Sequence, residues 1–76
     1  MKELLETLAR ALVDKHDEVE VSTVEGERSI ILQLKVASDD VGKVIGKEGR
    51  IAKALRTIVK ASAVKEGKKA VVEIID

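Results

Sequence analysis

The chain has 76 residues, of which 45% are hydrophobic and 37% charged, and its formal net charge is zero. These proportions are typical of a small folded domain, expected here to span residues 1–76, and they argue against disorder. There is no cysteine, which excludes disulfides and thiolate metal sites. No run approaches the roughly 18 apolar residues of a membrane helix and no signal peptide is evident, so the expected compartment is a reducing cytoplasm.

Aromatic content and charge distribution narrow the function further. Phe, Tyr and Trp are all absent, so domains that stack bases on aromatic side chains are not expected. Residues 1–27 carry three basic and eight acidic side chains, whereas residues 43–69 carry nine basic and two acidic ones. A local field of this kind can recruit an anionic partner although the whole chain is neutral. Two ordinarily solvated faces are the alternative interpretation.

The first predicted element is an amphipathic helix over residues 2–14. Its apolar positions recur at helical spacing and comprise Leu4, Leu5, Leu8, Ala11 and Leu12. The helix should end near His16, the only histidine. Because no nucleophile or metal-ligand partner lies near this histidine, we expect it to be an exposed helix-end residue without a catalytic role.

Two strands joined by a turn follow the helix. Val19 and Val21 alternate with polar residues, which is the pattern of a half-buried strand. A stronger alternation covers residues 29–36 and is the clearest strand signal in the chain. Residues 25–27, Glu-Gly-Glu, lie between the two runs and indicate a hairpin turn.

Two helices and a final strand complete the predicted elements. Residues 38–40, Ser-Asp-Asp, indicate a capped helix start, and a short helix over residues 40–45 should end at Gly46. A longer helix should run from just past Gly49 to about residue 64, followed by a β-branched strand over residues 70–75. The apolar side of the longer helix should comprise Ile51, Ala54, Leu55, Ile58, Val59 and Ser62 or Ala63.

The predicted order is therefore α-β-β-α-α-β, an α+β fold. The hairpin makes the first two strands antiparallel, and the helical crossover makes the last two parallel and right-handed if they are adjacent. The result is a three-stranded mixed sheet with three helices on one face. Ile31, Val71 and Ile75 would lie on the open face, where they would form an apolar surface suited to dimerisation.

The stretch from Val44 to Ile51 contains two glycines three residues apart, between the two predicted helices. Free backbone N–H groups and the positive end of the second helix dipole make this junction a candidate anion site. Lys47, Arg50 and Lys53 lie where they can reach phosphate oxygens. The spacing fits neither a P-loop nor a dinucleotide-binding fingerprint. A plain helix–turn–helix corner is the alternative.

The stretch Val44-Ile45-Gly46-Lys47-Glu48-Gly49-Arg50-Ile51 closely resembles the signature of KH domains. In that signature an apolar pair precedes G-x-x-G, and an isoleucine follows two positions later. The element order is similar to the type II arrangement of the family. Residues 42–61 resemble the small stand-alone bacterial KH proteins, the KhpA family. The resemblance covers the whole chain and implies a type II KH fold.

The resemblance implies a cytoplasmic RNA-binding protein with no cofactor. In KH domains the GXXG loop clamps about four nucleotides of single-stranded RNA. It further implies a homodimer, a larger KH-containing partner of the KhpB kind, and a role in post-transcriptional regulation or as an RNA chaperone. Paired carboxylates and Cys/His or Ser/His pairs are not evident, so enzymatic activity is not expected. A protein-interaction or dimerisation module and a ribosome-assembly factor on the same scaffold are the alternatives.

Carried over position by position, the resemblance implies the following RNA-binding residues. Gly46 and Gly49 would let the backbone approach the sugar-phosphate chain, and Lys47 would contact phosphate. Glu48, the other variable residue, departs from more basic loops and would weaken phosphate affinity. The groove beneath the bases would be lined or supported by Val41, Val44, Ile45 and Ile51. Basic contacts would come from Arg50 and Lys53 beside the loop and from Lys68 and Lys69 on the opposite rim. Arg56 should point elsewhere on its helix.

Overall fold

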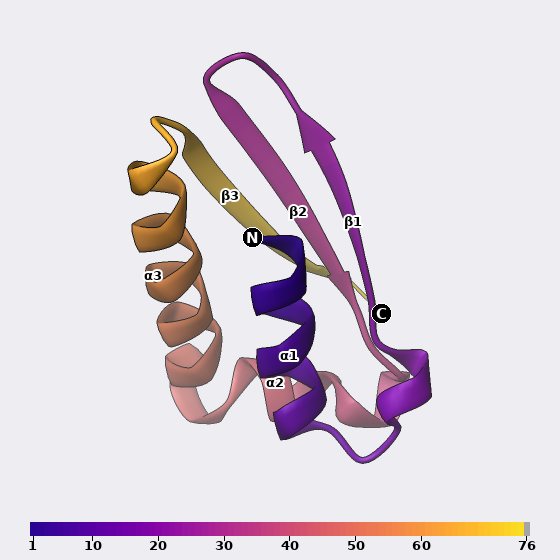
Figure 1. The fold of residues 1–76 in the computed structure, drawn as a ribbon. Coiled ribbons are helices and arrows are strands. Elements are labelled where there is room, and N and C mark those ends of the chain that lie inside the picture. The colour runs from indigo at the N-terminus through magenta and orange to yellow at the C-terminus, as the bar shows by residue number, and fades with distance from the viewer. Residues whose placement is uncertain (76) are drawn as a thin grey trace.

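The computed structural model describes residues 1–75 and confirms the predicted order of helices and strands. In chain order these are α1 Lys2–Leu12, β1 Glu20–Glu25, β2 Ser29–Lys35, α2 Val41–Ile45, α3 Arg50–Lys65 and β3 Lys69–Ile75. Short 3₁₀ turns are η1 His16–Glu18, η2 Ser38–Asp40 and η3 Lys47–Gly49. The helices all lie on one face of the sheet, and the other face is open (Figure 1).

The three strands form one mixed sheet in the order β1-β2-β3. Strands β1 and β2 are antiparallel, with Val21 opposite Leu34. Strands β2 and β3 are parallel, with Leu32 opposite Val72. The parallel pair needs a long connection, and the segment containing α2 and α3 provides it. The predicted α+β architecture is therefore confirmed, and the crossover places the α2–α3 junction at one end of the molecule.

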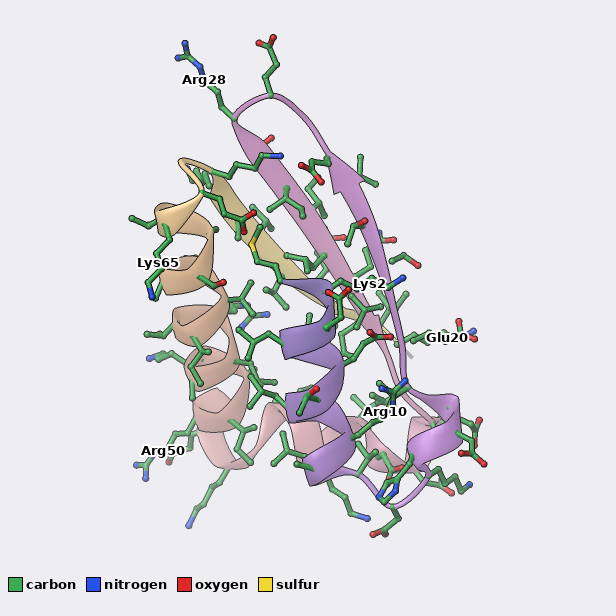
Figure 2. The ribbon with its side chains drawn as sticks, viewed as in Figure 1. Lys2, Arg10, Glu20, Arg28, Arg50 and Lys65 are labelled. Carbon is green, nitrogen blue, oxygen red and sulfur yellow. The ribbon has the colours of Figure 1, made fainter. Side chains whose placement is uncertain are left out.

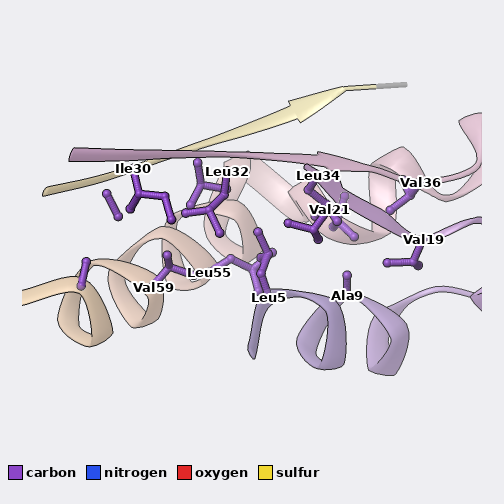
Figure 3. Packing of buried hydrophobic residues seen from close by; sticks show 14 of the residues in the cluster. Leu5, Ala9, Val19, Val21, Ile30, Leu32, Leu34, Val36, Leu55 and Val59 are labelled. Atoms are coloured by element: carbon purple, nitrogen blue, oxygen red, sulfur yellow. The ribbon is translucent and has the colours of Figure 1, made fainter. Parts of the chain in front are cut away.

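The core lies between the sheet and helices α1 and α3 (Figure 3). Burying one Leu, Ile or Val side chain contributes roughly 1.5–3 kcal/mol. The central strand β2 contributes every second side chain to the core, and β1, β3, α1 and α3 contribute the side chains that pack against them. The principal buried side chains are Leu5, Ala9, Val21, Ile30, Leu32, Leu34, Leu55, Val59 and Val72.

The open face of the sheet carries an apolar row that crosses all three strands. Val24 on β1 lies opposite Ile31 on β2, which lies opposite Val71 on β3. Val24 is 62% exposed, Val71 43% and Ile75 41%. The predicted position of Ile31, Val71 and Ile75 on the face away from the helices is therefore correct. Dimerisation through this face stays a prediction.

Two predicted helix features differ in the structure. Helix α1 ends at Leu12 and not at residue 14, because Val13 turns into extended backbone and is buried in the core. The Ser-Asp-Asp segment does not cap α2 or the turn before it, since neither has a side-chain cap bond. The reason is that Asp40 is buried and bonds to a distant segment instead.

The buried side of α3 also differs from the prediction. Leu55, Val59 and Ala63 are buried as expected, but Ala52 joins them in the buried row. Ala54 and Ile58 are exposed, and Ile58 is 43% accessible. The sheet accepts a narrow stripe of α3, so the apolar residues beside that stripe lie on the flank that faces α1. Within residues 1–75 no helix is both long and apolar enough to cross a bilayer.

Candidate nucleic-acid interface

Residues 46–49, called the glycine loop below, connect the short helix α2 to the long helix α3. Gly46 ends α2 with φ 77° and ψ 173°, a backbone conformation that is essentially restricted to glycine. A Cβ atom at Gly46 would also lie 2.5 Å from Cγ1 of Ile51. Two independent constraints therefore require glycine here, and the close approach of Ile51 fixes where the loop begins.

The other end of the glycine loop is constrained only by its backbone. Gly49 has φ 75° and ψ 14°, the left-handed conformation, and no heavy atom lies within 4 Å of an added Cβ. Glu48 also has a positive φ, of 58°. No side chain caps the N-terminus of α3. The N–H groups of Gly49 and Arg50 donate to the carbonyls of Gly46 and Lys47, so the donors that this end of α3 can offer to an anion are the amides that follow them.

The charged side chains of the glycine loop are at the surface. Lys47 and Lys53 are exposed. The guanidinium of Arg50 donates to Glu48 at 3.2 Å, with the two side chains 78% and 66% exposed. An ion pair in this environment is weak and easily exchanged for a phosphate contact. In the free protein Arg50 therefore lies beside the loop in a weak pair with Glu48.

The four apolar residues predicted for the groove differ in depth. Val44, in α2, is completely buried on the core side of that helix, so it can support a binding surface only from below. Val41 and Ile51 are half-buried and pack against the core. Ile45 is 38% exposed, and it is the member of this group that lies at the surface.

Lys68 and Lys69 lie at the far end of α3 from the glycine loop. Sixteen residues of helix separate the two ends, a length of about 24 Å. Arg50 and Lys65, which project into solvent in Figure 2, show this separation. The ammonium group of Lys68 pairs with Glu25 on β1, and its side chain is only 19% exposed. Lys69 is exposed.

Arg56 points elsewhere than the glycine loop, as expected, but its side chain is engaged within the domain. Its Nε donates to the backbone carbonyl of Val72 at 3.3 Å, so the side chain bridges from α3 to the edge strand β3. The sequence places Arg56 beside the buried stripe of α3. It contains no signal for which edge of the sheet the side chain reaches.

A polar cluster at the start of α2 was missed by the sequence analysis. The carboxylate of Asp40 is 1% exposed and accepts hydrogen bonds from the backbone N–H of Lys15 at 3.0 Å and from Nζ of Lys43 at 3.2 Å. The Lys15 hydrogen bond, aided by Lys43, holds the pKa of Asp40 below its usual value although burial opposes this. Asp14, with help from Asp40, raises the pKa of Lys43. Lys43 is therefore paired with Asp14 and Asp40 and is not a free phosphate ligand.

An apolar cavity of about 320 Å³ opens between α1 and α3. It begins beside the glycine loop, and its lining residues are Leu8, Ala11, Leu12, Arg50, Ile51, Ala54, Leu55 and Ile58. The lining is almost entirely apolar, so this cavity suits a hydrophobic partner and not a nucleic-acid backbone. Within residues 1–75 no cluster of His, Asp and Glu side chains is arranged to hold a metal ion.

A mixed three-stranded sheet in the order found here, with a G-x-x-G turn joining two helices over one face, defines a KH domain of type II. The family model described as "KhpA/KhpB, KH domain" matches residues 2–74. The chain therefore belongs to the KhpA/KhpB KH-domain family. No solved structure gave a significant match.

Named relatives align over nearly the full chain. The protein called RNA-binding protein KhpA from Clostridium acetobutylicum is 71% identical over 75 residues, covering 99% of this chain and 100% of that protein. The protein of the same name from Clostridium perfringens is 67% identical with the same coverage. The one from Caldanaerobacter subterraneus subsp. tengcongensis is 61% identical, again with the same coverage.

Proposed function

We propose that this protein is a non-enzymatic, cytoplasmic RNA-binding protein that holds about four nucleotides of single-stranded RNA beside the glycine loop. The names of relatives up to 71% identical support RNA as the ligand. The conformation of the glycine loop carries the proposal. Gly46 is fixed against Ile51, and the loop leads directly into an uncapped helix N-terminus. The exposed Lys47 and the uncapped helix N-terminus beside this fixed turn suit a phosphate group.

The proposed contacts follow from exposure and charge. Phosphate oxygens would accept from the amides of Lys47 and Glu48 and from the side chains of Lys47 and Lys53, while Arg50 would exchange Glu48 for phosphate. Ile45 would contact a base, with Val41, Val44 and Ile51 supporting it from below. The strand of RNA would then run along α3 towards Lys69. Lys68 is tied to Glu25, so it would contribute little unless that pair opens.

A single site of this size binds weakly, which gives oligomerisation a physical reason. Two linked sites raise the apparent affinity through effective concentration. We therefore include a homodimer, or a pair with a larger KH protein of the KhpB kind, in the proposal. The family description, which joins KhpA and KhpB, supports this. Post-transcriptional regulation or RNA chaperoning is the corresponding cellular role.

The test of RNA binding is the double variant Lys47→Asp with Glu48→Asp. It puts two anions where phosphate should lie, on a loop that buries nothing, and aspartate tolerates the positive φ of Glu48. We expect loss of binding to a labelled single-stranded RNA, measured by fluorescence anisotropy, with an unchanged circular dichroism spectrum. The matched control is Lys2→Asp with Glu3→Asp, the same pair of changes on the exposed start of α1. Equal RNA affinity in both variants would sink the assignment.

The cavity between α1 and α3 favours a second candidate function, a protein-interaction module. In that case Ile58→Asp, at the cavity wall, should disrupt complexes while the loop charge reversal is silent. RNA binding should weaken steeply with salt because phosphate contacts release counterions, whereas apolar docking should not. Titrations at low and high salt therefore separate the two functions.

A further inference from the structure

Asp40 is the one polar or charged side chain that is buried in the described chain. Both of its carboxylate oxygens are used. Oδ2 accepts from the backbone N–H of Lys15 at 3.0 Å, and Oδ1 accepts from Nζ of Lys43 at 3.2 Å. The first bond reaches the segment after α1, and the second returns to α2 itself. Asp14 adds a further link, because it also accepts from Nζ of Lys43.

The neighbouring residue Asp39 has the same chemistry but a different environment. Its carboxylate pairs only with Nζ of Lys15 at 3.1 Å, and the two side chains are 78% and 52% exposed. Such a pair is screened by water and contributes little. Asp39 and Asp40 are therefore a natural pair for comparison, one on the surface and one in the interior.

Helix α2 has only five residues, which is too short to be stable alone. Its position must come from its contacts with the rest of the protein. Val44 is buried in its middle, and Asp40 is bonded at its start. The glycine loop begins immediately after its last residue. The direction in which α2 leaves Asp40 therefore determines where Gly46 lies.

We propose that Asp40 is a positioning residue for the RNA-binding loop, acting through α2 without touching RNA. This inference rests on the proposed function. A buried charged group is a poor source of net stability, because its desolvation offsets much of the attraction. Its directional bonds do specify geometry. An apolar side chain would fill the same space, but it would leave the start of α2 without a fixed partner.

The first test needs no RNA. The amides of Gly46 and Gly49 donate to the carbonyls of Gly42 and Gly46 at 2.9 and 3.1 Å, so their hydrogen exchange reports on the loop. In Asp40→Ala we expect exchange at these two amides to be faster by about tenfold, because α2 loses the bond that ties its start to Lys15. Asp39→Ala should exchange like the wild type. Equal exchange in wild type and Asp40→Ala would overturn the positioning role.

The second test measures affinity for a labelled ten-nucleotide single-stranded RNA at several salt concentrations. Asp40→Ala should bind about tenfold more weakly, but with the same slope of log affinity against log salt, because no phosphate contact is removed. Asp39→Ala should bind within about twofold of wild type. A changed slope in Asp40→Ala would overturn the proposal, since Asp40 would then alter the number of phosphate contacts. Failure of the wild type to bind RNA would contradict the proposed function, while the exchange test would still stand.

If Asp40→Ala does not fold, the variant Asp40→Asn tests the positioning role instead. The amide oxygen still accepts from Lys15, but it is uncharged, so the bond that anchors α2 is weaker, and the amide nitrogen cannot accept from Lys43. Exchange at Gly46 and Gly49 about threefold faster, with RNA affinity about threefold lower, would support the proposal. Wild-type values in both measurements would overturn it.

Discussion

The two ends of α3 are alike in composition but differ in structure. Each is a short glycine-containing loop with lysines, residues 46–49 before the helix and residues 66–68 after it. After the helix, the N–H of Lys68 bonds to the carbonyl of Ala63 and that of Gly67 to Val64, both at 3.0 Å. This is a Schellman motif with Gly67 at φ 71°. Before the helix no side chain caps the N-terminus.

The lysine side chains of the two loops also differ in exposure and pairing. Lys68 is mostly covered and paired with Glu25, whereas Lys47 is exposed. The loop after α3 satisfies its own backbone groups and its own charge, whereas the glycine loop leaves Lys47 exposed and the N-terminus of α3 without a side-chain cap. A count of glycines and lysines therefore does not locate a binding site. The proposed site depends on exposed charge beside a fixed turn, and the following predictions test that distinction from the largest effect to the smallest.

Gly46→Ala should have the largest effect. The backbone strain costs about 1–3 kcal/mol, and the new Cβ, 2.5 Å from Cγ1 of Ile51, must displace that side chain. We expect the free energy of unfolding to fall by about 2–4 kcal/mol in urea titrations. RNA affinity should fall by at least about tenfold, because the loop moves. Gly42→Ala is the control: its site is helical and open, so stability should rise by up to about 1 kcal/mol. Equal stability of the two variants would contradict the steric argument.

Gly49→Ala and Gly67→Ala form a matched pair across α3. Both glycines have a left-handed backbone and open space where a Cβ would be added, so each variant should lose about 1–2 kcal/mol of stability. Only Gly49→Ala should weaken RNA binding, by about fivefold, because only that loop would face phosphate. Denaturation and anisotropy measured on the same samples separate the two effects. A similar loss of RNA affinity in Gly67→Ala would remove the distinction between the two ends.

Lys47→Gln and Lys68→Gln test the same comparison through charge. Losing one phosphate contact to single-stranded RNA reduces the slope of log affinity against log salt by about 0.7. We expect that reduction in Lys47→Gln and an unchanged slope in Lys68→Gln, since Lys68 is held by Glu25. Lys68→Gln should instead lower the free energy of unfolding by less than about 1 kcal/mol. An equal reduction in slope for both variants would show that the Lys68–Glu25 pair opens to bind RNA.

The sequence predicts much of this molecule because its patterns are local. Strand alternation, helical spacing and the glycines of residues 46–49 are read from neighbouring residues, and the element order they predict is correct. Contacts between residues far apart in the sequence are seen only in the structure. Which acid of the Ser-Asp-Asp segment is buried depends on Lys15, which lies 25 residues away from Asp40. The contact from Arg56 to β3 and the pairing of Lys68 with Glu25 depend in the same way on tertiary geometry.

Acid should affect the two ends of α3 differently, and this is the smallest expected effect. Hydrogen bonds hold the pKa of Asp40 below its ordinary value of 3.8, so in acid the unfolded chain binds the proton before the folded protein does. The contribution of Asp40 to stability is therefore fully present above that value and is lost as the pH falls through the folded-state pKa. The Schellman bonds at the other end join amides to backbone carbonyls, and the nearby acids Glu66 and Glu25 are exposed. Amide exchange between pH 6 and pH 2.5, corrected for intrinsic rates, should show Gly46 losing protection before Lys68. Parallel loss at both amides would mean that the protein unfolds as a whole and that Asp40 does not anchor the glycine loop separately.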